Sequence, residues 1–420
     1  MGKLSPMMEQ YLATKEQYKD CILFYRLGDF YEMFFDDALT ASKELEITLT
    51  GKDCGLEERA PMCGIPYHAA DIYINRLIEK GYKVAIGEQV EDPKLAKGLV
   101  KREVIRIVTP GTNMSAEILD EAKNNYIMSI SYYNFKYGIS VSDISTGIFK
   151  CCRVGTSDKV IDEINKYQPS EIIYQDTVPN SGLELDAIAD KLHISKTEAP
   201  AHYFDYDTSE ATIKRHFHIS SLEGLGLKDT PEIVVSTGAM LDYLYDTQMN
   251  SLKHINHIEL YSVDSYMIID SSTRRNLELT ETMRDKQKKG SLLWVLDKTK
   301  TAMGARKLRE FVEQPLLSKD AIEHRLDAIE AMNNALITRE ELREYLNTIY
   351  DLERLMTRIS LKTANPRDML SFKNSIHYLP DIKNLLKELS ADYYSEVYNN
   401  LDTLTDLYEL LEASIDEEPP

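Results

Sequence analysis

The sequence predicts a multidomain protein in which two mixed α/β domains are followed by an all-α segment. Three observations support this prediction. The chain has 420 residues, which is enough for two to four domains with separate cores. Short apolar runs typical of strands alternate with helical patterns up to about residue 255. From there to the end, apolar residues recur almost only at helical spacing. We therefore expect domains over residues 1–115, 116–255 and 256–420.

Strand and helix patterns alternate along the first domain. Ser5 and Pro6 are typical of a helix start, as N-cap and first helical residue, and the apolar stripe continues to about Lys19. The apolar run 21–27 predicts a strand that stops at Gly28 and Asp29. Further patterns predict helices over 36–45 and 71–80, and strands over 47–50, 83–89 and 104–108.

The second domain is expected to begin with three strands joined by short turns, which is typical of a meander. These strands cover 126–133, 136–144 and 148–154. A helix over 158–166 and a short strand over 171–174 follow, and helical patterns dominate from about 211 to 254. In the third domain the predicted helices cover 292–298, 304–313, 319–334, 338–347, 351–360, 366–378 and 385–412.

Composition excludes several classes of protein. The 49 basic residues are outnumbered by 69 acidic ones, and the resulting net charge of −20 argues against nonspecific nucleic-acid binding by the whole surface. No apolar run reaches the roughly 18 residues needed to span a bilayer, and the first residues contain no apolar signal core. The five cysteines show no zinc spacing. We therefore expect a cytoplasmic protein with free thiols, no metal site and no membrane partner.

Most catalytic signatures are missing from the sequence. The phosphate-binding pattern G-x-x-x-x-G-K followed by Ser or Thr does not occur, so no nucleotide site is predicted. Asp143 lies at the end of a predicted strand, just before a tight turn, where ribonuclease-H-like nucleases hold Mg²⁺. Two-metal chemistry needs three or four converging carboxylates, and no convincing partners can be found. A turn-capping aspartate is the better interpretation, with a metal-dependent nuclease around Asp143 as the alternative.

The segment Gly28-Asp29-Phe30-Tyr31-Glu32 is the strongest candidate for function. Phe30 has two interpretations: it fills a core with its aromatic neighbours, or it is an exposed wedge. An apolar ring can enter the minor groove, unstack a base step and kink the duplex. Unstacking costs a few kcal/mol, and least at a mispaired base, so such a ring detects deformability and not sequence. Glu32 could then accept a hydrogen bond from a base edge, if the backbone directs both side chains to one side.

Several blocks of sequence resemble the MutS family of DNA mismatch repair proteins. FYRLGDFYEMFFDDA resembles its mismatch-recognition segment. APMCGIPYHA, GYKVAIGEQVEDP and KREVIRIVTPGT resemble the rest of the family's first, mixed α/β domain. SVSDISTGIF resembles its connector domain, which has a ribonuclease-H-like α/β fold, and SSTRRNLELTET and LLWVLDKTKTAMGARKLREFVEQPL resemble the start of its helical core and lever domain. The resemblance covers essentially the whole chain, with the blocks in the family's order.

The resemblance implies a mechanism and a set of partners. Phe30 would stack on a mispaired base and Glu32 would hydrogen-bond it. The implied partners are double-stranded DNA with mismatches or small loops, a second copy in a homodimer of the full-length protein, and downstream repair proteins such as MutL. Family members are about twice as long, and their later half holds a DNA clamp and an ATPase domain. The resemblance therefore implies that this chain is not an enzyme, and that ATP and Mg²⁺ belong to the missing ATPase domain.

A basic run, KGLVKREVIR, gives weaker candidates for DNA contacts. Phosphates flanking a kink could be neutralised by Lys97, Lys101, Arg102 and Arg106. A solvated strand and loop explains the same run equally well.

Overall fold

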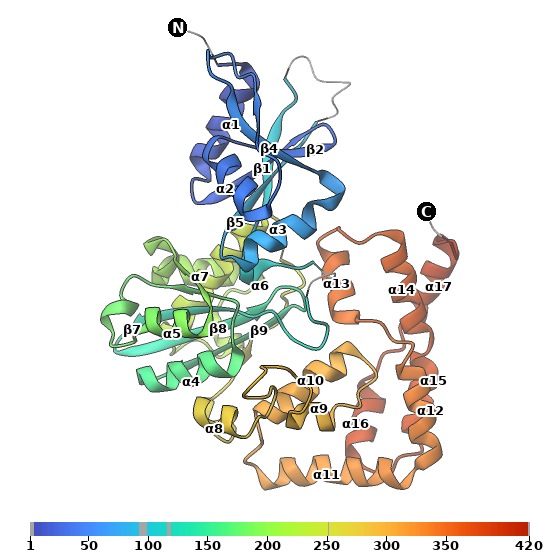
Figure 1. The fold of residues 1–420 in the computed structure, drawn as a ribbon. Coiled ribbons are helices and arrows are strands. Elements are labelled where there is room, and N and C mark those ends of the chain that lie inside the picture. Colours follow the sequence, from blue (N-terminus) through green and yellow to red (C-terminus); the bar gives the residue numbers. More distant parts are fainter. Residues whose placement is uncertain (1–3, 92–98, 116–118, 251, 419–420) are drawn as a thin grey trace.

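The computed structural model describes residues 4–91, 99–115, 119–250 and 252–418. Two sheets with helices on their faces are followed by an array of helices, as Figure 1 shows from blue to red. The predicted class, mixed α/β followed by all-α, is confirmed. Within the described residues, no helix combines the length and the apolar character that a membrane crossing requires.

The first sheet has six strands, with helices against both faces. Its order is β3 (Thr50–Lys52), β4 (Ala60–Pro66), β2 (Phe30–Phe34), β1 (Cys21–Leu27), β5 (Lys83–Gln89) and β6 (Arg102–Val108). β1 and β5 are parallel, and the other neighbours are antiparallel. Helices α2 (Phe35–Leu45) and α3 (Ala70–Glu79) pack on one face, and α1 (Pro6–Gln17) packs on the other. Each face therefore has its own apolar core.

The second sheet contains the predicted meander. Its order is β11 (Ser195–Glu198), β10 (Glu171–Tyr174), β7 (Ile127–Tyr133), β8 (Lys136–Asp143), β9 (Ile148–Val154) and β12 (Glu259–Leu260). β7, β8 and β9 are consecutive antiparallel strands, which confirms the prediction. One face packs against α6 (Tyr206–Phe217) and α7 (Pro231–Gln248), and the other against α4 (Ser157–Tyr167) and α5 (Leu185–Leu192).

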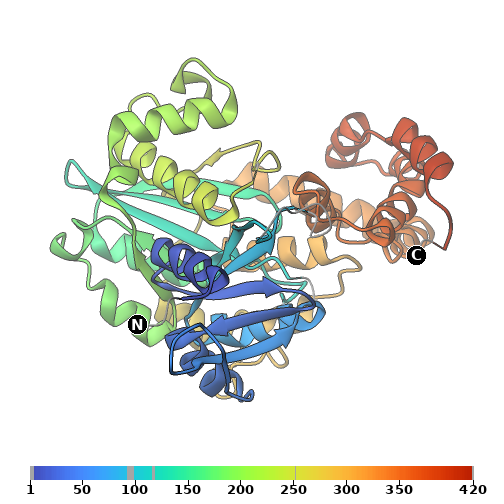
Figure 2. The ribbon, with the colours of Figure 1, turned by 90° about the horizontal axis from the view of Figure 1, so that it is seen from above.

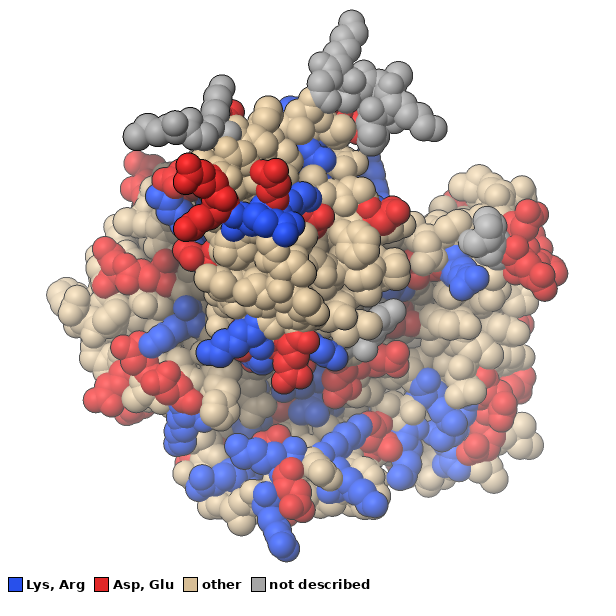
Figure 3. Space-filling model, turned by 45° about the horizontal axis from the view of Figure 1, so that its top comes forward, with Lys and Arg blue, Asp and Glu red and all other residues tan. Residues whose placement is uncertain are grey.

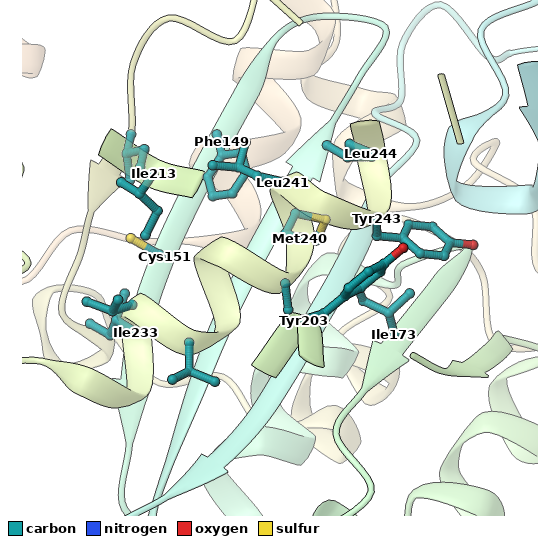
Figure 4. Close-up of a cluster of buried hydrophobic side chains, with 14 of the residues drawn as sticks. Phe149, Cys151, Ile173, Tyr203, Ile213, Ile233, Met240, Leu241, Tyr243 and Leu244 are labelled. Atoms are coloured by element: carbon teal, nitrogen blue, oxygen red, sulfur yellow. The ribbon is translucent and has the colours of Figure 1, made fainter. Parts of the chain in front are cut away.

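The core beneath α7 is continuous from helix to sheet. Figure 4 shows Met240 and Leu241 of α7 in one cluster with Phe149, Cys151 and Ile173 of the strands, and all five residues are buried. The helix lies closest to the sheet at Gly138 of β8, where a Cβ atom would lie 1.8 Å from a carbonyl oxygen of α7. A side chain at this position would push helix and sheet apart.

The later, red helices of the helical array stand to one side of the two sheets, whereas its first, orange helices lie against the second sheet (Figure 2). Its helices are α8 (Ser271–Asn276), α9 (Leu292–Leu296), α10 (Ala302–Glu313), α11 (Lys319–Asn334), α12 (Leu336–Leu346), α13 (Leu352–Ser360), α14 (Pro366–His377), α15 (Leu379–Leu386), α16 (Asp392–Asn400) and α17 (Thr405–Ser414). The single helix predicted over 385–412 is wrong, because α15 ends at Leu386 and α16 and α17 follow as separate helices. Trp294, the only tryptophan of the chain, lies on α9 and is 46% exposed.

Two buried arginines join the helical array to the segment between the sheets. Arg306 of α10 forms a bidentate ion pair with Asp351, at 2.7 and 2.8 Å, and donates to the carbonyl oxygen of Glu121 at 2.9 Å. Arg354 of α13 donates to the carbonyl oxygens of Asp120 and Lys123, each at 3.0 Å. These contacts attach the connecting segment to α10 and α13.

Candidate functional site

The candidate site is a hairpin at the end of the first sheet. β1 and β2 are joined by Gly28 and Asp29, and Leu27 pairs with Phe30 across the turn. Gly28 has φ +60°, a conformation that glycine adopts without the strain a side chain adds. Because side chains alternate along a strand, Phe30 and Glu32 lie on one face of β2 and Tyr31 lies on the other.

Phe30 differs from the aromatic residues around it. Its side chain is 46% exposed, whereas Tyr31 and Phe34 are buried in the cores on opposite faces of the sheet. Tyr31 is also held by a hydrogen bond from its hydroxyl to Glu88. The aromatic run therefore fills two cores and leaves the Phe30 ring in contact with solvent.

Glu32 forms an ion pair that the sequence did not reveal. Its carboxylate contacts the Lys52 ammonium group of β3, and the Glu32 side chain is only 16% exposed. Gly64 of β4 lies opposite Glu32 in the register, and a Cβ atom there would lie 3.5 Å from Glu32 Cγ. The same ammonium group lies 5.5 Å from the centre of the Phe34 ring. Lys52 therefore neutralises the carboxylate beside the exposed ring.

A second exposed ring lies next to the hairpin turn. The Tyr67 backbone N–H donates to the Asp29 carbonyl oxygen at 3.0 Å, and its side chain is 45% exposed. The Arg26 guanidinium stacks on the Tyr67 ring at 3.6 Å from the ring centre. This cation–π contact places a positive charge and an aromatic face beside the turn that carries Phe30.

The basic run does not form one patch. Lys97 lies outside the described residues. Lys101 is exposed and pairs with Glu103, whereas Arg102 donates to the carbonyl oxygens of Arg26 at 2.7 Å and Val100 at 2.9 Å.

Arg106 lies on the face of the sheet that packs against α3. Its register partner is Ile86, which belongs to the core on that face. Burial lowers the pKa of Arg106, and nearby Asp71 of α3 opposes that shift. Figure 3 shows Lys and Arg side chains interspersed with Asp and Glu over the visible face, with broad uncharged areas between them near the top.

Asp143 is a turn cap in the structure. Its side chain is fully buried. One carboxylate oxygen accepts from the backbone N–H and the hydroxyl of Ser145, at 2.9 and 2.7 Å. The other accepts from the Asn124 side chain at 2.7 Å and the Asn125 backbone N–H at 3.2 Å. Within the described ranges, no three His, Cys, Asp or Glu residues are grouped so that they could hold a metal ion. The geometry supports the turn-capping interpretation over the nuclease alternative.

Comparison with known families and relatives gives three consecutive matches. Models described as MutS domain I, MutS domain II and MutS domain III match residues 5–117, 125–256 and 272–420. A relative named DNA mismatch repair protein MutS, from Lachnoclostridium phytofermentans, is 60% identical over 420 residues, which is all of this chain and 45% of the relative. A protein of the same name from Acetivibrio thermocellus is 51% identical over 424 residues, covering all of this chain and 48% of the relative.

The chain thus spans about half the length of the curated relatives it matches. The three domain matches follow one another along nearly the whole chain, in the order in which the two sheets and the helical array occur. This chain belongs to the MutS family and carries its domains I, II and III.

Proposed function

We propose that this chain recognises mismatched or unpaired bases in double-stranded DNA and so initiates DNA mismatch repair. The observation that carries the proposal is the exposed Phe30 ring, on a strand whose other aromatic residues, Tyr31 and Phe34, are buried. The relatives' name, DNA mismatch repair protein MutS, supports the same conclusion.

The proposed mechanism depends on differential deformation of DNA. Phe30 enters the minor groove and separates two stacked base pairs. A matched duplex resists because stacking and pairing must both be broken, at a cost of a few kcal/mol. A mispaired or bulged site has already lost part of this energy, so the ring inserts there preferentially.

Glu32 acts as the polar partner of the wedge. It lies two residues from Phe30 on the same face of β2, so one hairpin presents both groups to the same base. A free carboxylate would be repelled by DNA phosphates. The ion pair with Lys52 reduces this repulsion while leaving the second carboxylate oxygen to accept a hydrogen bond from the base.

Phosphate contacts supply affinity without discrimination. We assign them to Lys97, Lys101, Arg102 and Arg106. Lys101 is solvent-exposed but would have to exchange Glu103 for phosphate. Arg102 would likewise have to exchange its present carbonyl partners, and Arg106 would be approached from the α3 side of the sheet.

The full-length protein extends this activity. We propose that it acts in the cytoplasm as a homodimer on DNA and passes the signal to downstream repair proteins such as MutL. ATP and Mg²⁺ would bind in a part of the protein outside this chain, because the matched relatives are about twice as long. On this proposal the present chain binds DNA and catalyses no reaction.

The wedge is tested with Phe30→Ala and a matched control. Fluorescence anisotropy measures the affinity of the chain for duplexes that differ only in one mispaired or one unpaired base. Phe30→Ala should lose the preference for the defective duplex and keep much of its general duplex binding, because phosphate contacts remain.

Phe135→Ala is the control, since Phe135 is 86% exposed in the turn between β7 and β8 of domain II. It should leave the preference intact. An unchanged preference in Phe30→Ala would refute the wedge, and a wild-type chain with no preference would refute the proposed function.

Glu32 is tested by two substitutions. Glu32→Ala should lower the mismatch preference by roughly ten- to a hundredfold, because a hydrogen bond to a charged group contributes about 1.5–3 kcal/mol. It should also bind matched duplex more tightly, since a negative charge near the phosphates is removed. Glu32→Gln keeps an acceptor oxygen and removes the charge, so it should retain more of the preference than Glu32→Ala. Equal preferences in both variants and the wild type would exclude Glu32 from recognition.

A further inference from the structure

A buried carboxylate lies where domain I joins domain II. Glu171 is the first residue of β10 and is fully inaccessible to solvent. One carboxylate oxygen accepts from the Thr109 hydroxyl and from the Gly111 backbone N–H at 3.1 Å. The other accepts from the Tyr243 hydroxyl at 2.6 Å and the Thr197 hydroxyl at 3.2 Å. Four neutral donors therefore satisfy this carboxylate.

Two of these donors belong to the segment that leaves β6 of the first sheet. Thr109 and Thr112 are fully or almost fully buried there, and the Thr109 backbone N–H donates to the Thr112 hydroxyl at 2.9 Å. At Gly111, a Cβ atom would lie 2.8 Å from Ile127 Cβ and 2.9 Å from Glu171 Cβ. We call residues 109–113 the connection between domains I and II. Its backbone therefore packs directly against β7 and β10 of the second sheet.

The other two donors belong to domain II itself. Thr197 lies on β11, and Tyr243 lies on α7, where Figure 4 shows its ring beside that of Tyr203. The connection is also bound from both sides by asparagine side chains. Asn113 donates to Asn75 of α3 at 2.7 Å, and Asn125 donates to the Pro110 carbonyl oxygen at 3.0 Å. Glu171 is the group at which the connection, β11 and α7 meet.

We propose that Glu171 is a positioning residue that fixes the orientation of domain I relative to domain II. A buried carboxylate that loses a donor keeps the full desolvation penalty of the unsatisfied oxygen, so its four donors are held together as a set. We call Glu171 and its four donors the joint between the two domains. Through this joint Glu171 sets the direction in which Phe30 meets a duplex held by the rest of the protein; this last step rests on the proposed function.

The orientation is measured in the whole chain by double electron–electron resonance. Spin labels are attached at Leu39→Cys on α2 and Phe135→Cys in domain II, both exposed positions, while all five native cysteines are buried. Glu171→Gln places an amide group against donors that face the carboxylate, and Tyr243→Phe removes one of the four hydroxyl or N–H donors. Both should broaden and shift the inter-label distance distribution.

Tyr203→Phe is the matched control. Tyr203 lies in the same core cluster, is as buried as Tyr243, and also donates its hydroxyl to a carboxylate, that of Asp246, without touching the connection. It should leave the distance distribution unchanged. If Glu171 and Tyr243 had a purely structural role, their substitution would lower the melting temperature and leave the distance distribution of the folded molecules unchanged. A narrow, unshifted distribution in Tyr243→Phe therefore overturns the proposal, even if Glu171→Gln does not fold.

DNA binding separates this inference from the proposed function. Tyr243→Phe should weaken the preference for mismatched duplex several-fold while Phe30 is intact, and Tyr203→Phe should not. If the variants show broadened distance distributions but the wild-type chain shows no mismatch preference, the joint is supported and its role in recognition is overturned. A mismatch preference together with unshifted distances would support the proposed function and overturn the joint.

Discussion

Phe30 and Tyr31 are adjacent in sequence and have opposite environments. Tyr31 is buried, and this burial, together with the hydroxyl bond to Glu88, raises the pKa of the phenol well above its usual value. The phenol therefore stays protonated and keeps donating to Glu88. On the proposed function, this buried anchor one residue from the exposed ring would hold β2 rigid while Phe30 inserts into DNA.

His254 gives the protein a pH-dependent stability. Its Nε2–H donates to the Ile144 carbonyl oxygen at 3.0 Å, and its Nδ1 has no hydrogen-bond partner among the described residues. Burial lowers the pKa of His254 from 6.5 to about 4. Between these two pH values the unfolded chain binds a proton that the folded chain does not. The free energy of unfolding should therefore fall by up to about 3 kcal/mol as the pH decreases from 6.5 to 4.

Urea denaturation at a series of pH values measures this effect. His254→Gln retains an N–H donor and does not titrate, so the variant should show a flatter dependence in the same window. Identical slopes for the variant and the wild type would show that other groups dominate acid destabilisation.

Gly138 determines how closely α7 approaches the second sheet. With a Cβ atom only 1.8 Å from the Glu232 carbonyl oxygen, any side chain at this position must displace the helix. The Ser131 hydroxyl donates to the same carbonyl oxygen at 2.9 Å, so the displacement would also break a buried hydrogen bond.

Gly138→Ala should lower the free energy of unfolding by about 3 kcal/mol, at the upper end of what overpacking costs. Gly155→Ala is the control, because it adds the same methyl group where no atom lies within 4 Å. Chemical denaturation of both variants measures the difference. Equal stabilities would mean that α7 shifts on the sheet at little cost.

Individual elements were predicted where their pattern is local. The hydrophobic runs of β1 and β5, the Pro-initiated α1 and the meander follow directly from sequence. β2 was missed because its apolar run continues into α2, and only the hairpin turn at Gly28 separates it from β1. The predicted helix 385–412 failed because tertiary packing breaks it: Leu404 has φ +51°, a left-handed conformation that its side chain does not suggest.

The candidate site was predictable only in part, for the same reason. Phe30 and Glu32 were singled out from the break at Gly28 and Asp29 and from the family resemblance, but their shared face depends on β2, which the pattern did not predict. Lys52 does not, since its position beside Glu32 depends on the register of β3 with β4 and of β4 with β2. Long-range pairing of this kind leaves no signal within a short window of sequence.

At the scale of the whole molecule, buried charges hold the parts together. Arg306 and Arg354 are each at least nine-tenths buried and contact backbone oxygens of the segment between the two sheets. Burial alone would raise the pKa of Asp351, but the Arg306 guanidinium holds it below its usual value. The hydrogen bonds from these two arginines therefore fix the segment between the two sheets against the helical array.

Arg306→Met should destabilise the chain by about 3–5 kcal/mol, because it leaves Asp351 buried without its main partner. Hydrogen exchange followed by mass spectrometry should show faster exchange in residues 119–125. Arg339→Met is the control, since Arg339 is less buried and pairs with the exposed Glu340. If residues 119–125 exchange equally slowly in both variants, the arginine does not anchor the segment.

The single tryptophan makes one of the three domains optically distinct. Trp294 lies on α9 of domain III and is half exposed, so its indole emission is sensitive to local changes in that domain alone. The 26 tyrosines are spread over all three domains. Following both fluorophores through a denaturation curve will therefore show, without any label, whether the helical domain melts together with the two sheets or apart from them.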